Sequence, residues 1–417
     1  MKTDNKVFGP KDIVEKAQRI LSYGIICDHC LGRQFGQMLK GYSNAERGRA
    51  IRLVVAMAND SEKLAFDESN FSGIGFRRDD VKKEGKVCCI CEGFFSKIDS
   101  YVDKASKLLG KREFSSFVVG TKLSENFVIN EESLWEAVGI DYCEPIKAEI
   151  NREVGKRIEK IMGKKADFEK PEIVVLIDFA QGDVYLEVNS LLIFGRYQKL
   201  VRGIPQTKWP SGKYKNSVEQ IIAKPFMKFS KGAEHALHGC GREDIDAKCL
   251  AWRPFVLEVT DPEKRNVPLL ALAKEVGKGG KVKIKDLRVV GKDVVVKVKE
   301  IRPEKTYRAI VSLKKPFEKE QLRELSKLRT MILQQTPERV LHRRTDKLRK
   351  RAVKEVKCKV LGKKKLEMIF RADAGTYIKE LISGDNGRTS PSMSSILRMP
   401  AKCTSLDVIG IHVKESL

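Results

Sequence analysis

The sequence lacks any long apolar segment. No apolar run of signal-peptide length occurs near the N-terminus, and Asp178, Asp183 and Glu187 interrupt the most apolar stretch, IVVLIDFAQGDVYLEVNSLLIF at residues 173–194. Signal peptides and membrane-spanning helices both need uninterrupted apolar runs. We therefore expect a cytoplasmic protein with no membrane span.

The sequence also lacks a nucleotide-binding loop. A Gly-rich tract, GKGG, occurs at residues 277–280. It is not flanked by the strand and helix that a phosphate-binding loop requires, so we interpret it as a turn. We expect no organic cofactor.

Acidic residues are too few to balance the basic ones. The chain of 417 residues has 81 Lys and Arg against 56 Asp and Glu, a net charge of +25. The excess is uneven, because residues 226–417 contain 44 basic against 24 acidic residues and residues 1–225 contain 37 against 32. A basic excess of this size indicates a polyanionic partner, which should contact mainly the C-terminal half. The length and the apolar content of 41% predict a globular protein of two or three domains.

Four of the ten cysteines form two C-x-x-C pairs, Cys27 with Cys30 and Cys88 with Cys91. Disulfides are rare in a reducing compartment, and two such pairs can supply four thiolates to a tetrahedral zinc ion. Four sulfur ligands leave no open coordination position, so the expected zinc is structural. The spacer of 57 residues is longer than in a compact zinc ribbon. A redox-active C-x-x-C is the alternative for either pair.

The middle of the chain combines an amphipathic helix with a β-hairpin. Residues 146–161 place isoleucine and valine side chains on one helical stripe, and an AQGD turn joins two strand-like runs after them. A basic and aromatic run, GRYQKLVRGIPQTKW, follows. This arrangement resembles a THUMP domain, a module with which RNA-modifying enzymes hold tRNA, over about residues 95–215. We place the domain boundary near residue 225.

Two further patterns occur in the C-terminal half. Residues 281–301 alternate around a turn at residues 291–293 and predict a pair of strands. Residues 339–365 contain thirteen Lys or Arg against two acidic residues, and part of this run alternates like a strand with one cationic face.

Asp244 lies in a charged loop, GCGREDIDAKC at residues 239–249, which precedes a strand-like run at residues 253–259. A loop pinned beside a core strand is a suitable place for a catalytic carboxylate. Taken alone, however, the stretch is more typical of an acidic surface turn.

Three stretches in order, GREDID, KTYRAIV and AGTYIKELISGD, resemble the active-site motifs of pseudouridine synthases. With the cysteine pairs and the THUMP-like middle, nearly the whole chain resembles the archaeal and eukaryotic tRNA pseudouridine synthases that modify T-loop positions 54 and 55. The resemblance implies an α+β fold, in which a pseudouridine synthase domain with a mixed or antiparallel sheet, residues 226–417, follows a zinc-bearing, THUMP-containing domain, residues 1–225. It implies an isomerase that acts on the T-arm of tRNA, and we expect a monomer.

The resemblance also implies roles for the motif residues. Asp244 would be the catalytic carboxylate, kept ionised by Lys379, since an opposite charge within ~4–6 Å lowers the pKa of a carboxyl group. Asp246 is its rival, disfavoured only by the motif spacing. The remaining motif residues would bind the substrate or pack under it. Tyr307 would stack on the uracil and stand near the proton lost from C5, where a general-base role is suggested only by its residue type. Arg242 would fill the space left by the everted nucleotide, Tyr377 would contact the substrate, and Leu381 would pack under the site.

Two other functions fit parts of the sequence. Another THUMP-linked tRNA-modifying enzyme, such as a methyltransferase or thiolase, would need a nucleotide or S-adenosylmethionine loop, which we do not find. A non-catalytic tRNA-binding protein would keep the basic charge and the zinc, but it has no need for Asp244, Tyr307 and Lys379 to converge. The sequence does not decide whether position 54, position 55 or both are modified, nor the order of the covalent steps.

Overall fold

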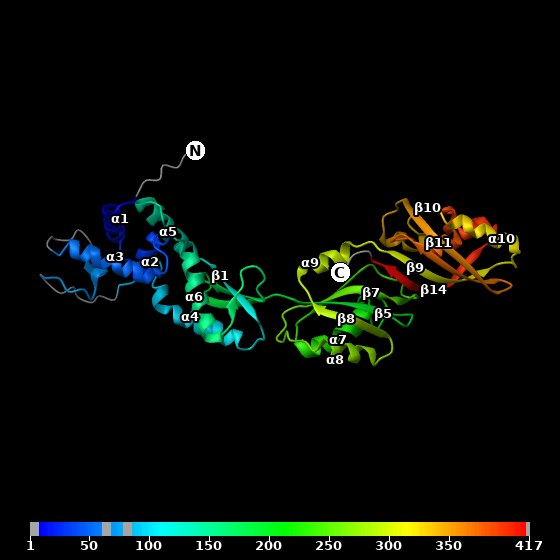
Figure 1. Cartoon of the computed structure of the whole chain (residues 1–417), viewed down its shortest axis with the longest axis horizontal. Helices are drawn as coiled ribbons and strands as arrows, with labels where there is room; N and C mark the ends of the chain where they lie inside the picture. The colour runs from blue at the N-terminus through cyan, green and yellow to red at the C-terminus, as the bar shows by residue number, and fades with distance from the viewer. Residues whose placement is uncertain (1–7, 61–67, 78–85, 414–417) are drawn as a thin grey trace. The chain divides into compact units, whose positions relative to one another are not determined.

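The computed structural model describes residues 8–60, 68–77 and 86–413, which belong to two units (Figure 1). Unit 1 ends at Asn189 and unit 2 begins at Ser190. The boundary predicted near residue 225 is wrong, because Pro225 lies inside α7 (Val218–Ser230), a helix whose apolar side packs within unit 2.

The first part of unit 1 is a helical module around the two C-x-x-C pairs. The predicted capping box at Ser43 is present: its hydroxyl accepts from the Glu46 N–H at 3.2 Å, and the Glu46 carboxylate accepts from the Ser43 N–H at 2.7 Å. The helices of this module are α1 (Pro10–Tyr23), α2 (Asp28–Gly32), η1 (Arg33–Phe35), α3 (Asn44–Ala58), η2 (Glu68–Phe71) and α4 (Phe94–Leu109).

Helices α2 and α3 approach each other backbone to backbone. A Cβ atom added to Gly48 would lie 1.9 Å from the carbonyl oxygen of Asp28, and one added to Gly32 would lie 1.8 Å from that of Asn44. Only glycine allows such an approach. These two glycines therefore determine how α2, which carries Cys30, sits on α3.

The second part of unit 1 is a four-stranded sheet in the order β2-β1-β3-β4. The predicted hairpin is present as β3 and β4, and the predicted amphipathic helix is present as α6, which buries Ile146, Ile150, Val154 and Ile158. The elements are β1 (Ser116–Lys122), α5 (Glu125–Val138), α6 (Ile146–Met162), β2 (Lys165–Ala166), β3 (Ile173–Asp178) and β4 (Asp183–Val188).

Unit 2 is built on one ten-stranded sheet in the order β13-β10-β11-β12-β9-β14-β7-β5-β8, with β6 paired to β7. Within this sheet the β14–β7 pair is parallel, and the remaining pairs between its described strands are antiparallel. The predicted α+β fold with a mixed sheet is confirmed. The strands are β5 (Leu191–Lys199), β6 (His235–Gly239), β7 (Lys248–Val259), β8 (Val282–Val289), β9 (Glu304–Leu313), β10 (Met331–Gln334), β11 (Arg349–Gly362), β12 (Lys365–Ala372), β13 (Thr389–Ser390) and β14 (Ala401–His412).

Strand β5 belongs to unit 2, although the THUMP-like segment predicted at residues 95–215 includes it. It follows β4 after two residues but pairs with β7 and β8. Its buried side chains, among them Ile193 and Tyr197, pack against α7 and α8 (Leu269–Gly277). Strand β5 is therefore assigned to unit 2 by its pairing with β7 and β8, which are distant in sequence.

The second strand predicted within residues 281–301 is also wrong. Residues 282–289 form β8, but the Val-rich run after the turn forms helix α9 (Lys292–Glu300). Val294 and Val298 lie on one helical face. Together with Ile301, the residue after the helix, they pack on Phe194 and other side chains of β5 and β7. Figure 1 shows α9 on one face of this part of the sheet and α7 and α8 on the other.

Short helices cover the opposite end of the sheet. Ile378, Leu381 and Met393 are buried against the strands β9, β12 and β14. This packing fixes the segments that carry the second and third motifs relative to each other. The helices are α10 (Lys319–Glu324), η3 (Leu325–Leu328), η4 (Glu338–Arg343), α11 (Ile378–Ser383), η5 (Asp385–Gly387) and α12 (Met393–Leu397).

Candidate active site and cysteine cluster

Asp244 lies on the loop between β6 and β7, and the preceding residue anchors that loop in the core. The Glu243 side chain is 1% exposed and lies 3.0 Å from an Arg253 Nη atom and 3.7 Å from the Lys199 Nζ atom. The buried Tyr197 hydroxyl donates to the same carboxylate at 3.1 Å. A buried carboxylate is tolerated only when it is paired in this way.

The Lys199 ammonium also ties down the loop backbone. Its side chain is fully buried, and Nζ donates to the carbonyl oxygens of Ile204, Asp244 and Ile245 at 3.0–3.2 Å. Burial lowers the pKa of Lys199, and the charge of Glu243 opposes that effect. Asp244 is therefore held through its own carbonyl group.

The Asp244 carboxylate faces two cations from distant parts of the chain. Its Oδ2 atom lies 3.2 Å from Nζ of Lys379 on α11 and 3.3 Å from an Nη atom of Arg339 on η4. The side chain is 37% exposed, so it is both paired and accessible. The predicted ion pair of Lys379 with Asp244 is present, and Arg339 was not anticipated.

Lys379 is shared with Asp246. Its Nζ atom donates to both carboxylate oxygens of Asp246 at 2.8 Å, shorter than its contact with Asp244. Burial opposes ionisation of Asp246, but the hydrogen bond and charge of Lys379 outweigh it and lower the pKa of that carboxyl group. The Asp246 side chain is 70% exposed. Of the two carboxylates, Asp244 is the one that lines the main cavity.

The third motif is held rigidly at the start of α11. The Tyr377 backbone exchanges two hydrogen bonds of 3.0 Å with the amide of Gln334, which is fully buried. The Tyr377 hydroxyl accepts from an Nη atom of Arg344 at 2.9 Å. Leu381, one turn later, is fully buried in the core. Lys379 therefore projects toward Asp244 from a fixed backbone.

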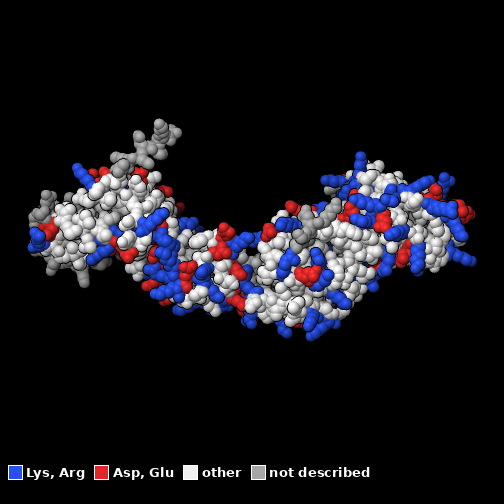
Figure 2. All heavy atoms as spheres, in the orientation of Figure 1, with Lys and Arg blue, Asp and Glu red and all other residues white. Residues whose placement is uncertain are grey.

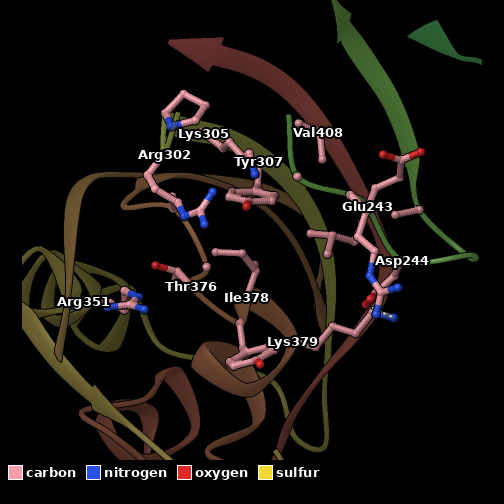
Figure 3. Close-up of a pocket in the computed structure, with 18 of the residues that line it drawn as sticks. Glu243, Asp244, Arg302, Lys305, Tyr307, Arg351, Thr376, Ile378, Lys379 and Val408 are labelled. Carbon is pink, nitrogen blue, oxygen red and sulfur yellow. Dashed lines mark ion pairs between the residues drawn. The ribbon is translucent and has the colours of Figure 1, made fainter. Parts of the chain in front are cut away.

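Tyr307 projects from β9 into the same cavity as Asp244 (Figure 3). It is 8% exposed, and burial raises its pKa to about 12. The phenol is therefore neutral near pH 7 and offers an aromatic face to a ligand.

The cavity has a volume of about 600 Å³ and is strongly cationic. Its acidic lining residues are Glu243 and Asp244. Arg242, predicted from the first motif, lines it and is exposed. The Lys and Arg residues that line it are Arg242, Arg253, Arg302, Lys305, Arg339, Arg344, Arg349, Arg351 and Lys379.

Four of these basic residues come from the run at residues 339–365, whose cationic character was evident in the sequence although its position at the site was not. Figure 2 shows Lys and Arg side chains crowding the part of unit 2 that contains β10, β11 and α10. Lys305 opens the KTYRAIV motif and Lys199 lies in the basic run GRYQKLVRGIPQTKW, but neither pattern indicated that the side chain is buried at this site. Arg302 had no signal that singled it out. Such a cavity suits a ligand with several negative charges.

The four cysteines of unit 1 come together as predicted. The Sγ atoms of Cys27, Cys30, Cys88 and Cys91 all lie within 4.8 Å of one another, and those of Cys27 and Cys91 are 3.7 Å apart. A tetrahedral site with Zn–S bonds of ~2.3 Å requires S···S separations of about 3.8 Å. The cluster therefore fits a structural metal ion of zinc type, held by four thiolates.

Comparison with known sequences identifies the family. A profile described as "Pus10, C-terminal" matches residues 192–412, more than half of the chain. The chain belongs to the Pus10 family. A second profile, the archaeal Pus10 THUMP domain, matches residues 101–178 and confirms the THUMP resemblance, but over a shorter range than predicted.

Pus10 relatives align with nearly the whole chain, and each is named "tRNA pseudouridine synthase Pus10". The protein of Methanothrix thermoacetophila is 39% identical, with 98% of this chain and 96% of the relative covered. That of Pyrococcus furiosus is 38% identical, with 96% and 98% covered. A chain of the solved Cbf5-Nop10-Gar1 complex is similar at 14% identity and a TM-score of 0.32 over 52% of this chain and 48% of that chain, too low to inform the site.

Among the residues that the structure describes, no helix is both long and apolar enough to cross a membrane.

Proposed function

We propose that this member of the Pus10 family is a tRNA pseudouridine synthase that isomerises uridine at positions 54 and 55 of the T loop, with Asp244 as its catalytic carboxylate. The observation that carries the proposal is the placement of Asp244 between Lys379 and Arg339, in the cavity that Tyr307 also lines. The curated relatives carry the name of this activity over nearly the whole chain.

The reaction breaks the bond between C1′ and N1 of uridine and forms a bond between C1′ and C5. Asp244 attacks or deprotonates the nucleotide so that the base detaches, and the base rotates and rejoins through carbon. The proton lost from C5 is balanced by the proton gained at N1. Lys379 and Arg339 hold the Asp244 carboxylate in position for this role through ion pairs of 3.2 and 3.3 Å.

Tyr307 supports the base rather than the proton transfer in this proposal. A phenol with a pKa of about 12 is a poor general base near pH 7, while its ring is well placed for stacking. Arg242 lies at the cavity wall and occupies the place of the everted nucleotide, whose extrusion costs a few kcal/mol. Tyr377 contacts the substrate, and Leu381 supports α11 from below.

We assign the chemistry to unit 2 and the holding of tRNA to both units. The basic surface of unit 2 binds phosphates of the T-arm, and the THUMP domain of unit 1 contributes tRNA affinity. A zinc ion on Cys27, Cys30, Cys88 and Cys91 stabilises unit 1 and takes no part in the reaction. It acts as a crosslink between α2 and the segment before α4.

The test compares Asp244→Ala with Asp246→Ala. Both variants remove one carboxylate that pairs with Lys379, but Asp246 does not line the cavity. Tritium release from tRNA labelled at uridine C5 is expected to fall to background in Asp244→Ala and to stay within about tenfold of the wild type in Asp246→Ala. Binding of tRNA should change little in either, because affinity comes from many phosphate contacts.

Turnover near the wild-type level in Asp244→Ala, or loss of turnover in Asp246→Ala alone, would refute the assignment. Normal tRNA binding without tritium release by the wild-type protein would favour a non-catalytic binding protein. Mapping the product with transcripts that carry a single uridine, at position 54 or 55, decides the position.

A further inference from the structure

Lys305 is a buried lysine in the cavity for which the mechanism above has no use. It lies on β9 two residues before Tyr307, is 8% exposed and lines the cavity. Among the described residues no carboxylate or hydrogen-bond acceptor pairs with its ammonium group. A lysine is almost never buried without a partner, because the desolvated charge is costly.

The backbone next to Lys305 leaves room for this side chain. A Cβ atom added to Gly241 would lie 2.9 Å from the Lys305 Nζ atom, and Gly241 has a φ of +68°. Nζ therefore lies against the turn at the start of the catalytic loop. Gly241 allows both the turn and the close approach of the ammonium group.

Arg302 and Arg351 are among the arginines of the same cavity that have no acidic partner in the described part of the chain. Arg302 donates to the carbonyl oxygen of Lys299 at 2.7 Å, and Arg351 donates to that of Lys350 at 2.8 Å. The Arg351 Nε atom is buried with no hydrogen-bond partner. By contrast, Arg253, Arg339 and Lys379 each pair with a carboxylate.

Arg302 and Arg351 connect the cavity with an adjoining hollow. Both residues line the main cavity and a second one of about 580 Å³. The two acidic residues of that hollow, Glu304 and Asp373, already contact the Lys354 ammonium. Figure 3 labels Arg302, Lys305 and Arg351 together with Tyr307 among the side chains that line the main cavity. A nucleotide chain that ran from one hollow to the other would pass these cations.

We propose that Arg302, Lys305 and Arg351 form an anion site for the phosphodiester that links the target uridine to its neighbour in the RNA. The inference rests on the proposed function, because it names the part of the substrate that these residues bind. The uridine occupies the main cavity, the neighbouring nucleotide occupies the adjoining hollow, and the phosphate between them supplies the partner that Lys305 lacks.

The charge state of Lys305 supports this site. Burial and the nearby Arg253 lower its pKa to about 8. Three other groups act on Lys305. Glu243 lies against Lys199 and Arg253. Burial raises the pKa of the Cys249 thiol to about 11 and also raises the pKa of the Cys240 thiol. A bound phosphate favours the ammonium form, so binding the substrate raises the pKa of Lys305.

The experiment pairs variants of Lys305 with substrates that lack one phosphate charge. Full-length tRNAs assembled by ligation carry a neutral methylphosphonate at the linkage 5′ or 3′ of the target uridine. In wild-type protein one of these linkages should raise KM by about tenfold, the size expected for a charge-assisted hydrogen bond. On normal tRNA, Lys305→Met should raise KM to a similar degree. The neutral linkage should then raise the KM of this variant little further. The kcat of the variant should stay within about threefold of that of the wild type.

Lys305→Arg is the conservative control. It should restore KM near pH 7.5, because the guanidinium stays charged. From pH 7.5 to pH 9, KM of the wild type should rise more than KM of Lys305→Arg, because only lysine loses its proton in this window. A merely structural lysine would not produce this difference. The Tm of Lys305→Met should equal or exceed that of the wild type, since the variant removes a buried charge.

The exposed Arg302→Gln supplies a second variant with little risk to folding, and it should also raise KM several-fold and show the same loss of sensitivity to the neutral linkage. Equal KM values for wild type and Lys305→Met would overturn the inference. It would also be overturned if the effects of Lys305→Met and of each neutral linkage on KM were fully additive. Competition by inorganic phosphate without any effect of the neutral linkages would show a site for free phosphate and would also overturn it. Turnover by Asp244→Ala, measured in the same assay, would instead overturn the proposed function.

Discussion

Replacement of Glu243 by glutamine should be costly although the two side chains have nearly the same shape. The substitution leaves Lys199 and Arg253 buried without the carboxylate that they share. Removing one partner of a buried ion pair costs about 3–5 kcal/mol. For a unit of this size the corresponding fall in Tm is about 6–20 °C.

The substitution should also reduce turnover, because the same cluster holds the catalytic loop. Lys199 donates to the Asp244 carbonyl oxygen, and Arg253 donates to that of Cys240 at 2.8 Å. When the cluster relaxes, the Asp244 carboxylate loses its position relative to Lys379. A displacement of about 1 Å in a catalytic group can lower the rate about 100-fold, so we expect kcat to fall about 10- to 100-fold with KM little changed.

The stability deficit should depend on pH. Burial lowers the pKa of Lys199 and Glu243 raises it, so the pKa falls further in Glu243→Gln. A lysine whose folded-state pKa lies below its unfolded value destabilises the fold at low pH, and this effect shrinks as pH rises through the folded-state pKa. The difference in unfolding free energy from the wild type should therefore be smaller at pH 9.5 than at pH 7.

Urea unfolding at the two pH values, together with tritium release, measures these effects. Glu263→Gln is the matched control, because Glu263 pairs with Lys231 on the surface at 2.9 Å and exposed pairs contribute at most about 1 kcal/mol. The reasoning would be refuted if Glu243→Gln lowered the unfolding free energy by no more than the control does. It would also be refuted if the loss of unfolding free energy in Glu243→Gln grew with pH.

Two further predictions concern unit 1. Purified protein should contain about one zinc ion per chain, and Cys88→Ser should lower the zinc content and make unit 1 more sensitive to protease, because metal binding is coupled to folding; an unchanged zinc content would contradict the four-cysteine site. Gly48→Ala should destabilise unit 1 by about 3 kcal/mol and weaken zinc binding, because its Cβ would lie 1.9 Å from the Asp28 carbonyl oxygen. Gly155→Ala, whose Cβ would meet only a Val119 methyl group at 3.8 Å, should be neutral or stabilising by up to about 1 kcal/mol, and equal effects in the two helices would contradict the packing argument.

The sequence alone determined the features that depend on near neighbours along the chain. The capping box at Ser43 follows from N-capping preferences, and the apolar stripe of α6 follows from helix periodicity. Both effects act over a few residues. The two C-x-x-C pairs predicted that the four cysteines lie close together, because four soft ligands suit one metal ion. The three motifs indicated Asp244, Tyr307 and Lys379 as a group.

Only the tertiary structure decided the features that depend on distant partners. Strand β5 continues the hairpin in sequence but joins the sheet of unit 2, because β7 and β8 supply its hydrogen bonds and its apolar cover. The Val-rich run of α9 is as compatible with a strand as with a helix, and its packing on β5 and β7 selects the helix. Side chains from other elements likewise decide three features of the site. Lys379 pairs with both Asp244 and Asp246, Arg339 contacts Asp244, and Lys305 has no acidic partner among the described residues. Burial and charge balance at a site are sums over such neighbours, and no local pattern in the chain records them.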